Sequence, residues 1–305
     1  MTADHRFLHV DRFADGRIVR IALNRPETRN AQNRGLLVEL DQAFSAAAAD
    51  PTVRVVILRG HGRSFSSGHD LGSSVARGEN GTGAERHPSR DLHGGTRAAT
   101  ERRMLQEWHY FFDNTMRWRE LDKVTIAEVH GQVFAAGLML MWACDLIVAA
   151  DDTQFVDVVG TRLGMCGVEY FAHPWEMGPR RAKEMLLTGD YVGAQSAERW
   201  GMINCVVPAA ELEQATLSLA AQVAEHPPAK ASAIKQIANR TADHRGFLNA
   251  LRACFSLHQL NHAHWAELSG SRTNVGTPEF GLPDWRQAPP IAEADHRAVG
   301  AGWTP

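Results

Sequence analysis

The sequence predicts an α/β fold, because short apolar strand patterns alternate with helical patterns along the first half of the chain. The strands expected at 53–58, 124–130 and 146–150 are rich in valine, isoleucine and leucine and carry few charges. Such runs are typical of parallel strands buried on both faces of a sheet. With 305 residues, the chain can form one large α/β domain or two modest domains.

The first elements follow one another without a long gap. Residues 17–23 alternate between apolar and other residues after a turn at Gly16, so they predict a strand that leaves a hairpin. A helix is expected between the cap residue Asn33 and Asp50, because the apolar residues of this stretch recur at helical spacing. The buried strand at 53–58 comes next.

Residues 72–103 differ from the rest of the chain. They hold six glycines and only six apolar residues, so they cannot bury enough surface to offset the entropy of ordering them. We therefore expect a mobile insertion here. Helical spacing returns at Met104, with an aromatic stripe through Trp108, Phe111 and Phe112. The stripe would pack into the core or, alternatively, form a lid over an apolar ligand.

Helical patterns dominate the second half of the chain. The helices expected there cover 181–188, 212–224 and 228 to about 269. The last 36 residues carry glycine, proline and little periodicity, and we expect them to form a tail. The predicted domains are a core at 1–205, a C-terminal helical region at 206–269 and the tail at 270–305.

Charge and composition disfavour several classes of function. The formal net charge is −3, so the chain lacks an overall basic field that would attract nucleic acid or a membrane surface. The longest apolar run, at 133–144, is too short to span a bilayer, and the N-terminus shows no signal-peptide pattern. The four cysteines are scattered without paired spacing, which suits a reducing compartment. We expect a cytoplasmic protein.

Two strand–turn–helix junctions are candidates for chemistry. One covers 65–71 and the other covers 131–137, each just after an expected strand. Small residues at such turns let a ligand approach the backbone, and free N–H groups at a helix start stabilise negative charge. Facing one another, the two junctions would form an oxyanion hole of main-chain donors. Ordinary tight turns are the alternative interpretation.

A series of motifs runs in a fixed order from residue 5 to about residue 265. The motifs lie at 23–31, 55–60, 65–71, 126–131, 144–149, 187–208 and 228–235. Together they resemble the crotonase (enoyl-CoA hydratase/isomerase) superfamily. The resemblance implies a crotonase-like (ClpP/crotonase) spiral of ββα units with a C-terminal helical trimerisation region. It also implies assembly as a homotrimer or a dimer of trimers.

The resemblance further implies an enzyme of fatty acid metabolism that acts on an acyl-CoA thioester, with coenzyme A as part of the substrate and no separate cofactor. Two backbone N–H groups would hold the oxyanion of the thioester enolate, and these positions match His69 and Ala136. Lys235 is a candidate partner for the 3′-phosphate of coenzyme A. The positions that would line coenzyme A match Glu27, Thr28, Ala31, Ser67, His69, Asp70, Leu71 and Ala136.

This sequence departs from the family at its two proton-transfer positions. Family hydratases use two glutamates around one water, one as base and one as acid. The first position matches Met139, and the second matches Gly160 or its neighbour Val159. Methionine and glycine cannot transfer protons, so the acid–base group must have moved if this chain catalyses hydration.

Several residues are candidates for the missing acid–base group, although each could instead have a structural role. Glu169 and Asp157 are the leading candidates, since both lie near the second empty position. Asp70 fits a turn and helix-cap role better than that of a base. The other residues considered are Glu128, a charge inside an apolar strand, His173, and the stripe-helix residues Glu107, His109 and Tyr110.

A lyase of the enoyl-CoA hydratase type is the leading expectation for function. The alternatives are another reaction of the same enolate, such as enoyl-CoA isomerisation or hydrolysis of a C–C bond, and a non-catalytic acyl-CoA-binding protein. RNA binding, which occurs in one branch of the family, is disfavoured by the net charge and by only four lysines. No metal site is expected, because no HxxxH or HxH pair is recognised on a convincing helix or strand, and on a helix His262 and His264 would point about 200° apart.

Overall fold

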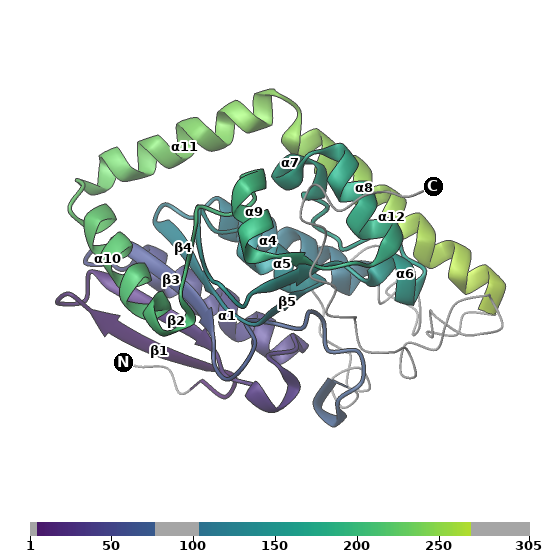
Figure 1. Cartoon of the computed structure of the whole chain (residues 1–305), viewed down its shortest axis with the longest axis horizontal. Helices are drawn as coiled ribbons and strands as arrows, with labels where there is room; N and C mark the ends of the chain where they lie inside the picture. Colours follow the sequence, from purple (N-terminus) through teal and green to yellow (C-terminus); the bar gives the residue numbers. More distant parts are fainter. Residues whose placement is uncertain (1–4, 77–103, 270–305) are drawn as a thin grey trace, which may run out of the picture.

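A six-stranded sheet forms the centre of the protein (Figure 1). The computed structural model describes residues 5–76 and 104–269. The strand order is β1-β2-β3-β4-β6-β9, with β1 antiparallel to β2 and the other neighbours parallel. A smaller sheet has the order β5-β7-β8. The strands are β1 (Leu8–Phe13), β2 (Ile18–Leu23), β3 (Val55–Gly60), β4 (Val124–Val129), β5 (Gln132–Phe134), β6 (Leu146–Ala150), β7 (Gln154–Val156), β8 (Val192–Gly193) and β9 (Cys205–Val207).

Helices surround the two sheets. They are η1 (Pro26–Thr28), α1 (Arg34–Ala49), η3 (Glu107–Asp113), α4 (Asn114–Arg119), α5 (Ala136–Trp142), α6 (Val159–Leu163), α7 (His173–Met177), α8 (Pro179–Thr188), α9 (Ala194–Trp200), η4 (Ala209–Glu211), α10 (Leu212–Ala224), α11 (Pro228–His244) and α12 (Phe247–Ser269). The predicted α/β class is confirmed. The long predicted elements correspond to β2, β3, β4, β6, α1, α8 and α10, whereas the short strands β5, β7, β8 and β9 carry too little pattern to be recognised.

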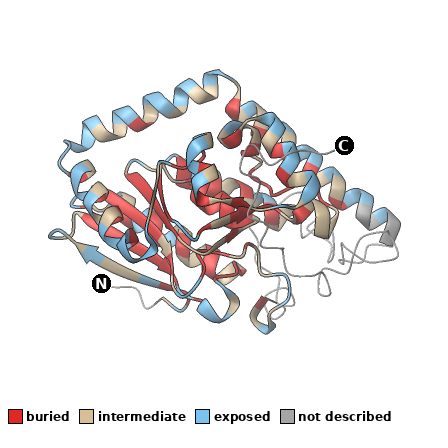
Figure 2. Ribbon diagram, viewed as in Figure 1, coloured by how far each residue is buried: buried red, intermediate tan, exposed pale blue. Residues whose placement is uncertain are grey.

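The central strands are covered on both faces, as their apolar runs predict. Every residue of β2 and of β4 is buried, and the strands of the large sheet are mostly red in Figure 2. On one face, Ile126 of β4 packs in a cluster with Leu212 of α10. On the other face, Ala127 and Val129 join the larger core with α1 and α5. Because successive strand residues point to opposite faces, position 128 shares the α10 face.

The predicted boundary between a core at 1–205 and a helical region at 206–269 stays a prediction. Residue 205 lies in β9 (Cys205–Val207), which is the edge strand of the large sheet beside β6. Helix α10, which follows the boundary, packs on that sheet. Only α11 and α12 extend beyond the sheet, with α11 along one edge of the molecule in Figure 1.

The predicted insertion and tail lie almost wholly outside the described residues. Of the insertion at 72–103, only residues 72–76 are described, and a helix begins at residue 74. Residues 77–103 and the tail at 270–305 are not described.

Within the described ranges, none of the helices combines the length and the apolar character that crossing a membrane requires.

Candidate active site

The two strand–turn–helix junctions predicted from the sequence lie directly against one another. Ser66 of the first junction receives the N–H of Phe134 at 2.9 Å and donates its own N–H to Gln132 at 3.2 Å. Gly68 has a φ of +90°, and a Cβ placed on it would lie 2.9 Å from the oxygen of Phe134 and 3.1 Å from the nitrogen of Ala136. Glycine is therefore required at position 68 for the two turns to touch.

The main-chain N–H groups of His69 and Ala136 are not used by the hydrogen bonds that join the turns. Gln32 forms two main-chain hydrogen bonds with the neighbours of His69. Its N–H donates to the oxygen of Gly68 at 2.8 Å, and its oxygen accepts the N–H of Asp70 at 3.0 Å. Ala136 is the first residue of α5, so its N–H has no partner inside that helix. Within the described ranges, neither the N–H of His69 nor the N–H of Ala136 donates a main-chain hydrogen bond outside the helices and strands.

The segment at 25–32 is hydrogen-bonded along the first junction. Ser67 donates its N–H to the oxygen of Arg29 at 2.9 Å and its hydroxyl to the oxygen of Thr28 at 3.1 Å. The predicted coenzyme A residues thus come from two adjacent segments. Of these, Glu27 and Leu71 are exposed, Thr28 and Ser67 are half-buried, and Ala31 is buried.

Asp70 holds the turn that follows His69. Its Oδ1 accepts the N–H of Ser73 at 2.9 Å, and its Oδ2 lies 2.8 Å from the Arg25 guanidinium. Burial would raise the pKa of Asp70, but the hydrogen bonds from Ser73 and Arg25 outweigh burial and lower the pKa below its ordinary value. A carboxylate held in its charged form is a poor base, so these contacts support the predicted cap role.

The two positions of the family glutamates are closed. Met139 is buried in the core on α5. A Cβ on Gly160 of α6 would lie 2.9 Å from the main-chain oxygen of Leu186, so a longer side chain has no room there unless the backbone shifts. The local packing therefore supports the inference that any acid–base group has moved.

Glu169 is the predicted candidate that the structure brings to the first junction. Its side chain is almost fully buried, and its Oε2 lies 3.1 Å from Nε2 of His69. The ring of Phe111 stacks on the His69 imidazole, with centroids 3.6 Å apart. The aromatic stripe therefore serves in two ways: Phe112 packs in the core, and Phe111 covers His69.

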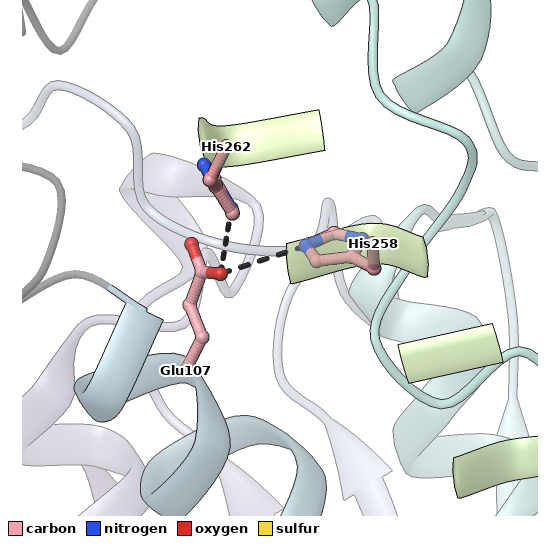
Figure 3. Close-up of side chains that lie close together, drawn as sticks. All are labelled: Glu107, His258 and His262. Atoms are coloured by element: carbon pink, nitrogen blue, oxygen red, sulfur yellow. Dashed lines mark ion pairs between the residues drawn. The ribbon is translucent and has the colours of Figure 1, made fainter. Parts of the chain in front are cut away.

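A second cluster lies beside Glu169, and the sequence analysis missed it. Oε2 of Glu107 is 2.7 Å from Nε2 of His262 and 3.5 Å from Nε2 of His258 (Figure 3). Oε1 of Glu169 is 3.6 Å from the same nitrogen of His258. The available signal was the spacing of the two histidines, because residues four apart share one face of a helix. The expectation that no HxxxH pair lies on a helix is wrong, because His258 and His262 form such a pair on α12.

Charge balance within the cluster is unusual for a buried site. Burial would raise the pKa of Glu107, but the two imidazoles outweigh burial and lower the pKa to about 2. Burial would lower the pKa of His258, but Cys166, Glu107 and Glu169 raise it to about 11. Either a proton on the imidazole or another cation would complement the buried carboxylates.

Asp157 directly follows β7, whose Val156 accepts the N–H of Ala135 in the second junction at 2.8 Å, but its carboxylate is used inside the fold. It is fully buried, with Oδ1 accepting the N–H of Val159 at 2.8 Å and Oδ2 accepting the N–H of Val168 at 3.0 Å. His173, another candidate, is fully buried 3.1 Å from Oδ2 of Asp157. Asp157 thus positions the chain just before Glu169, and the pair has no exposed atom with which to meet a substrate.

Glu128 lies on the α10 face of the sheet, opposite the face that carries α5. It is fully buried, and its Oε1 is 3.2 Å from the guanidinium of Arg59. Burial raises the pKa of Glu128, although Arg59 opposes the effect. Because the sheet separates Glu128 from Ala136, we assign Glu128 no role at the junctions.

The remaining candidates from the sequence are Lys235 and two residues of η3, His109 and Tyr110. Lys235 is buried, with Nζ 2.9 Å from Oδ2 of Asp145 and 3.1 Å from the oxygen of Lys123. The expectation that Lys235 meets a phosphate is therefore wrong, since its charge is used inside the fold. His109 and Tyr110 of η3 contact one another edge to face, with centroids 4.6 Å apart, and we assign neither a proton-transfer role.

Comparison with known proteins matches the whole described core. The sequence model of the family described as "Enoyl-CoA hydratase/isomerase" matches residues 14–93 and 89–264. The chain is 55% identical over 291 residues to the Mycobacterium tuberculosis protein named "Putative enoyl-CoA hydratase EchA13". The match covers 95% of this chain and 92% of that protein.

Two more comparisons extend the similarity. The carnitinyl-CoA dehydratase of Escherichia coli strain K12 is 34% identical over 242 residues, which cover 77% of this chain and 81% of that protein. A crystal structure of a probable enoyl-CoA hydratase from Mycobacterium smegmatis superimposes with a TM-score of 0.76 at 41% identity. It covers 87% of this chain and 98% of that one, and the likeness confirms the predicted crotonase-like fold.

Proposed function

This chain belongs to the enoyl-CoA hydratase/isomerase family, and from that premise we propose that it stabilises the enolate of an acyl-CoA thioester and hydrates an enoyl-CoA. The observation that carries the proposal is the direct contact of the two junctions at Gly68. In the proposed reaction, the N–H groups of His69 and Ala136 donate to the thioester oxygen as negative charge develops on it. Donors of this kind contribute roughly 10²–10³-fold to a rate.

We assign proton transfer to Glu169, supported by its contact with His69. In hydration, the oxygen of water bonds to C3 of the enoyl thioester while a carboxylate accepts a proton from the water. The electron pair of the C2=C3 bond moves toward the thioester oxygen, and C2 then takes the proton that the carboxylate accepted, which returns Glu169 to its charged form. Oε2 of Glu169 lies 3.1 Å from the His69 imidazole, whose main-chain N–H is a proposed oxyanion donor. This proximity places a carboxylate beside the residue that would contact the thioester.

We propose that coenzyme A lies along the two segments that contain Glu27, Thr28, Ala31, Ser67 and Leu71, with Asp70 holding their turn. The hydrogen bonds between these segments support the proposal, because they keep the binding residues in one fixed arrangement. A fixed arrangement lowers the entropy lost when a ligand binds. Asp157 is in this scheme a positioning residue for the Glu169 segment rather than a group that meets the substrate.

The names of the relatives favour hydration over the other reactions of the enolate. Both carnitinyl-CoA dehydratase and EchA13 carry names of hydration or dehydration activity. Double-bond isomerisation and C–C bond hydrolysis remain the alternatives for this chain, because Met139 and Gly160 stand where family hydratases have glutamates. Binding of acyl-CoA without catalysis is the alternative of a different class.

One assay separates these functions. Purified protein is mixed with crotonyl-CoA and with longer enoyl-CoAs, and loss of the conjugated thioester absorbance reports hydration. Exchange of the α-proton of an acyl-CoA in deuterated water, followed by NMR, reports enolate formation. We expect both hydration and exchange. Exchange without hydration would favour an isomerase or another enolate reaction, and binding without either would favour an acyl-CoA-binding protein. Failure to bind any acyl-CoA would contradict the proposal.

We also propose a homotrimer or a dimer of trimers, built through the C-terminal helices. Large apolar side chains are exposed on α11 and α12, and a partner subunit could cover them. They are Ile234, Ile237, Leu257 and Leu260, with exposed fractions of 55%, 67%, 61% and 62%. Sedimentation equilibrium tests this proposal, and a mass equal to one chain at micromolar concentration would contradict it. The cytoplasmic location and the role in fatty acid metabolism stay predictions from the sequence.

A further inference from the structure

Three potential metal ligands converge between η3 and α12. They are Oε2 of Glu107, Nε2 of His258 and Nε2 of His262, and all three atoms lie within 4.8 Å of one another. His258 and His262 stand one turn apart on α12, while Glu107 comes from the start of η3 (Figure 3). The ring of Phe112 stacks on Phe255 at 4.6 Å and holds these two elements together.

The same three atoms lack hydrogen bonds. All three residues are buried, with exposed fractions of 7%, 3% and 7% for Glu107, His258 and His262. Within the described ranges, none of the three ligand atoms has a hydrogen-bond partner, although the atoms lie at ion-pair distances. Unsatisfied polar atoms are expensive to bury, so a group of three that points to one place needs an explanation.

The second nitrogen of His258 is held in the way that metal-binding histidines are held. Nδ1 lies 2.9 Å from the main-chain oxygen of Gly167. If Nδ1 carries the proton that it donates to this carbonyl, then Nε2 keeps a lone pair for a ligand, and Nε2 lies 3.5 Å from Oε2 of Glu107. Metal ligands commonly show this arrangement, in which an outer carbonyl fixes the tautomer and the ring orientation.

We propose that Glu107, His258 and His262 bind a divalent transition-metal ion of the Zn²⁺ type. Two imidazoles and one carboxylate are a common protein ligand set for zinc, and they leave a fourth position for water. Ligand atoms at about 2.0–2.1 Å from a tetrahedral ion stand about 3.3 Å apart. The contact of Glu107 with His258 measures 3.5 Å and that with His262 measures 2.7 Å. Binding therefore requires a shift of about 0.2 Å at the first contact and about 0.6 Å at the second, and the three atoms, which lie within 4.8 Å of one another, must come to about 3.3 Å apart.

Glu169 links this site to the proposed acyl-CoA site. Its Oε1 is 3.6 Å from Nε2 of His258, and its Oε2 is 3.1 Å from Nε2 of His69. Glu169 is not one of the three residues whose ligand atoms lie together, so it is placed to accept a hydrogen bond from a water on the ion. The metal site does not depend on the proposed function, because its ligands can be tested without any acyl-CoA.

The competing explanation is a cluster held by protons alone. The raised pKa of His258 and the lowered pKa of Glu107 would let an imidazolium pair with the carboxylate. Such a cluster would bind no ion, and the two explanations therefore give different stoichiometry in a binding experiment.

The experiment uses full-length protein without a histidine tag. The protein is stripped with a chelator and titrated with ZnCl₂ by calorimetry, and bound metal is counted by mass spectrometry. We expect about one ion per chain. Replacing Zn²⁺ with Co²⁺ should give the visible absorption of a tetrahedral cobalt centre. This readout needs no variant, so it tests the proposal even if a substitution impairs folding.

Variants locate the site. Glu107→Gln and His262→Gln should each weaken Zn²⁺ binding by at least about tenfold, since even the loss of an outer hydrogen bond has this effect. His264→Gln is the matched control: it lies two residues further on the same helix, is exposed, and should leave affinity unchanged. Circular dichroism checks the folding of each stripped variant. Wild-type protein that binds no ion, or variants that bind as tightly as wild type, would overturn the proposal.

Discussion

Glu128 and Glu169 are both buried glutamates, yet they differ in backbone structure and in the charged groups around them. Glu128 belongs to a regular strand on the α10 face of the sheet, and its charged neighbour is Arg59 at 3.2 Å. Glu169 lies in the irregular segment between α6 and α7 and faces two imidazoles, at 3.1 Å from His69 and 3.6 Å from His258.

The difference teaches that an unusual position in the sequence is a poor guide to chemistry. Glu128 is the more conspicuous residue, the one charge in a six-residue strand of apolar residues and a threonine, but it lies on the face away from Ala136. Glu169 is less conspicuous, but it contacts groups that can exchange protons with it. What marks Glu169 as the carboxylate that we expect to act is its contact with His69, a residue of the first junction, rather than its burial.

The largest expected effect separates the two glutamates by activity. Glu169→Gln should lower kcat/KM for enoyl-CoA hydration by at least about 100-fold, because an amide cannot accept the proton of water. Glu128→Gln is the matched control and should retain activity close to wild type, since it has no contact with the junctions. Steady-state kinetics with crotonyl-CoA measures both. A larger loss of kcat/KM in Glu128→Gln than in Glu169→Gln would contradict this assignment.

A smaller effect tests the contact between the two junctions. Gly68→Ala places a Cβ within 2.9–3.1 Å of three atoms of the second junction at a φ of +90°, whereas Gly201→Ala meets no atom within 4 Å at a φ of +76°. Both variants should lose about 1 kcal/mol of unfolding free energy from strain at positive φ. Gly68→Ala should lose about 1–3 kcal/mol more from overpacking.

Urea denaturation measures the two losses, and hydration assays follow the same variants. Gly68→Ala should also reduce kcat, because the nitrogen of Ala136 must move. Equal losses of unfolding free energy in the two variants would show that the junctions do not depend on close contact at position 68.

The smallest expected effect concerns Glu176, a third glutamate, whose side chain is half-buried. Burial raises its pKa to about 7, with Arg119 opposing the effect. The folded state therefore keeps a proton that the unfolded state, with an ordinary pKa of 4.5, releases. The unfolding free energy of wild type should fall as the pH rises from 4.5 through 7, since the folded state binds more protons in this range.

Glu176→Gln removes this titration. The unfolding free energy of the variant should therefore fall less than that of wild type as the pH rises from 4.5 through 7. Denaturation midpoints of wild type and variant, measured across this range, give the difference. If the difference does not depend on pH, then the pKa of Glu176 is not raised in the folded protein, which would contradict the prediction.

The sequence by itself determined the order of the long strands and helices and the two junctions. Apolar runs fix β2, β3, β4 and β6 because a local pattern decides whether a segment is buried in a sheet. Gly68 and Ala136 could be identified for the same reason, since small residues at the end of a strand leave few backbone alternatives. The motifs around them were sufficient for the family resemblance.

Only the tertiary structure decided which titratable groups meet. His69 and Glu169 are 100 residues apart along the chain, and Glu107 meets His262 only because η3 packs against α12. Side-chain convergence depends on how distant elements pack, and no local propensity encodes it. The ligand cluster and the opposite faces of Glu128 and Glu169 therefore became visible only in the folded chain.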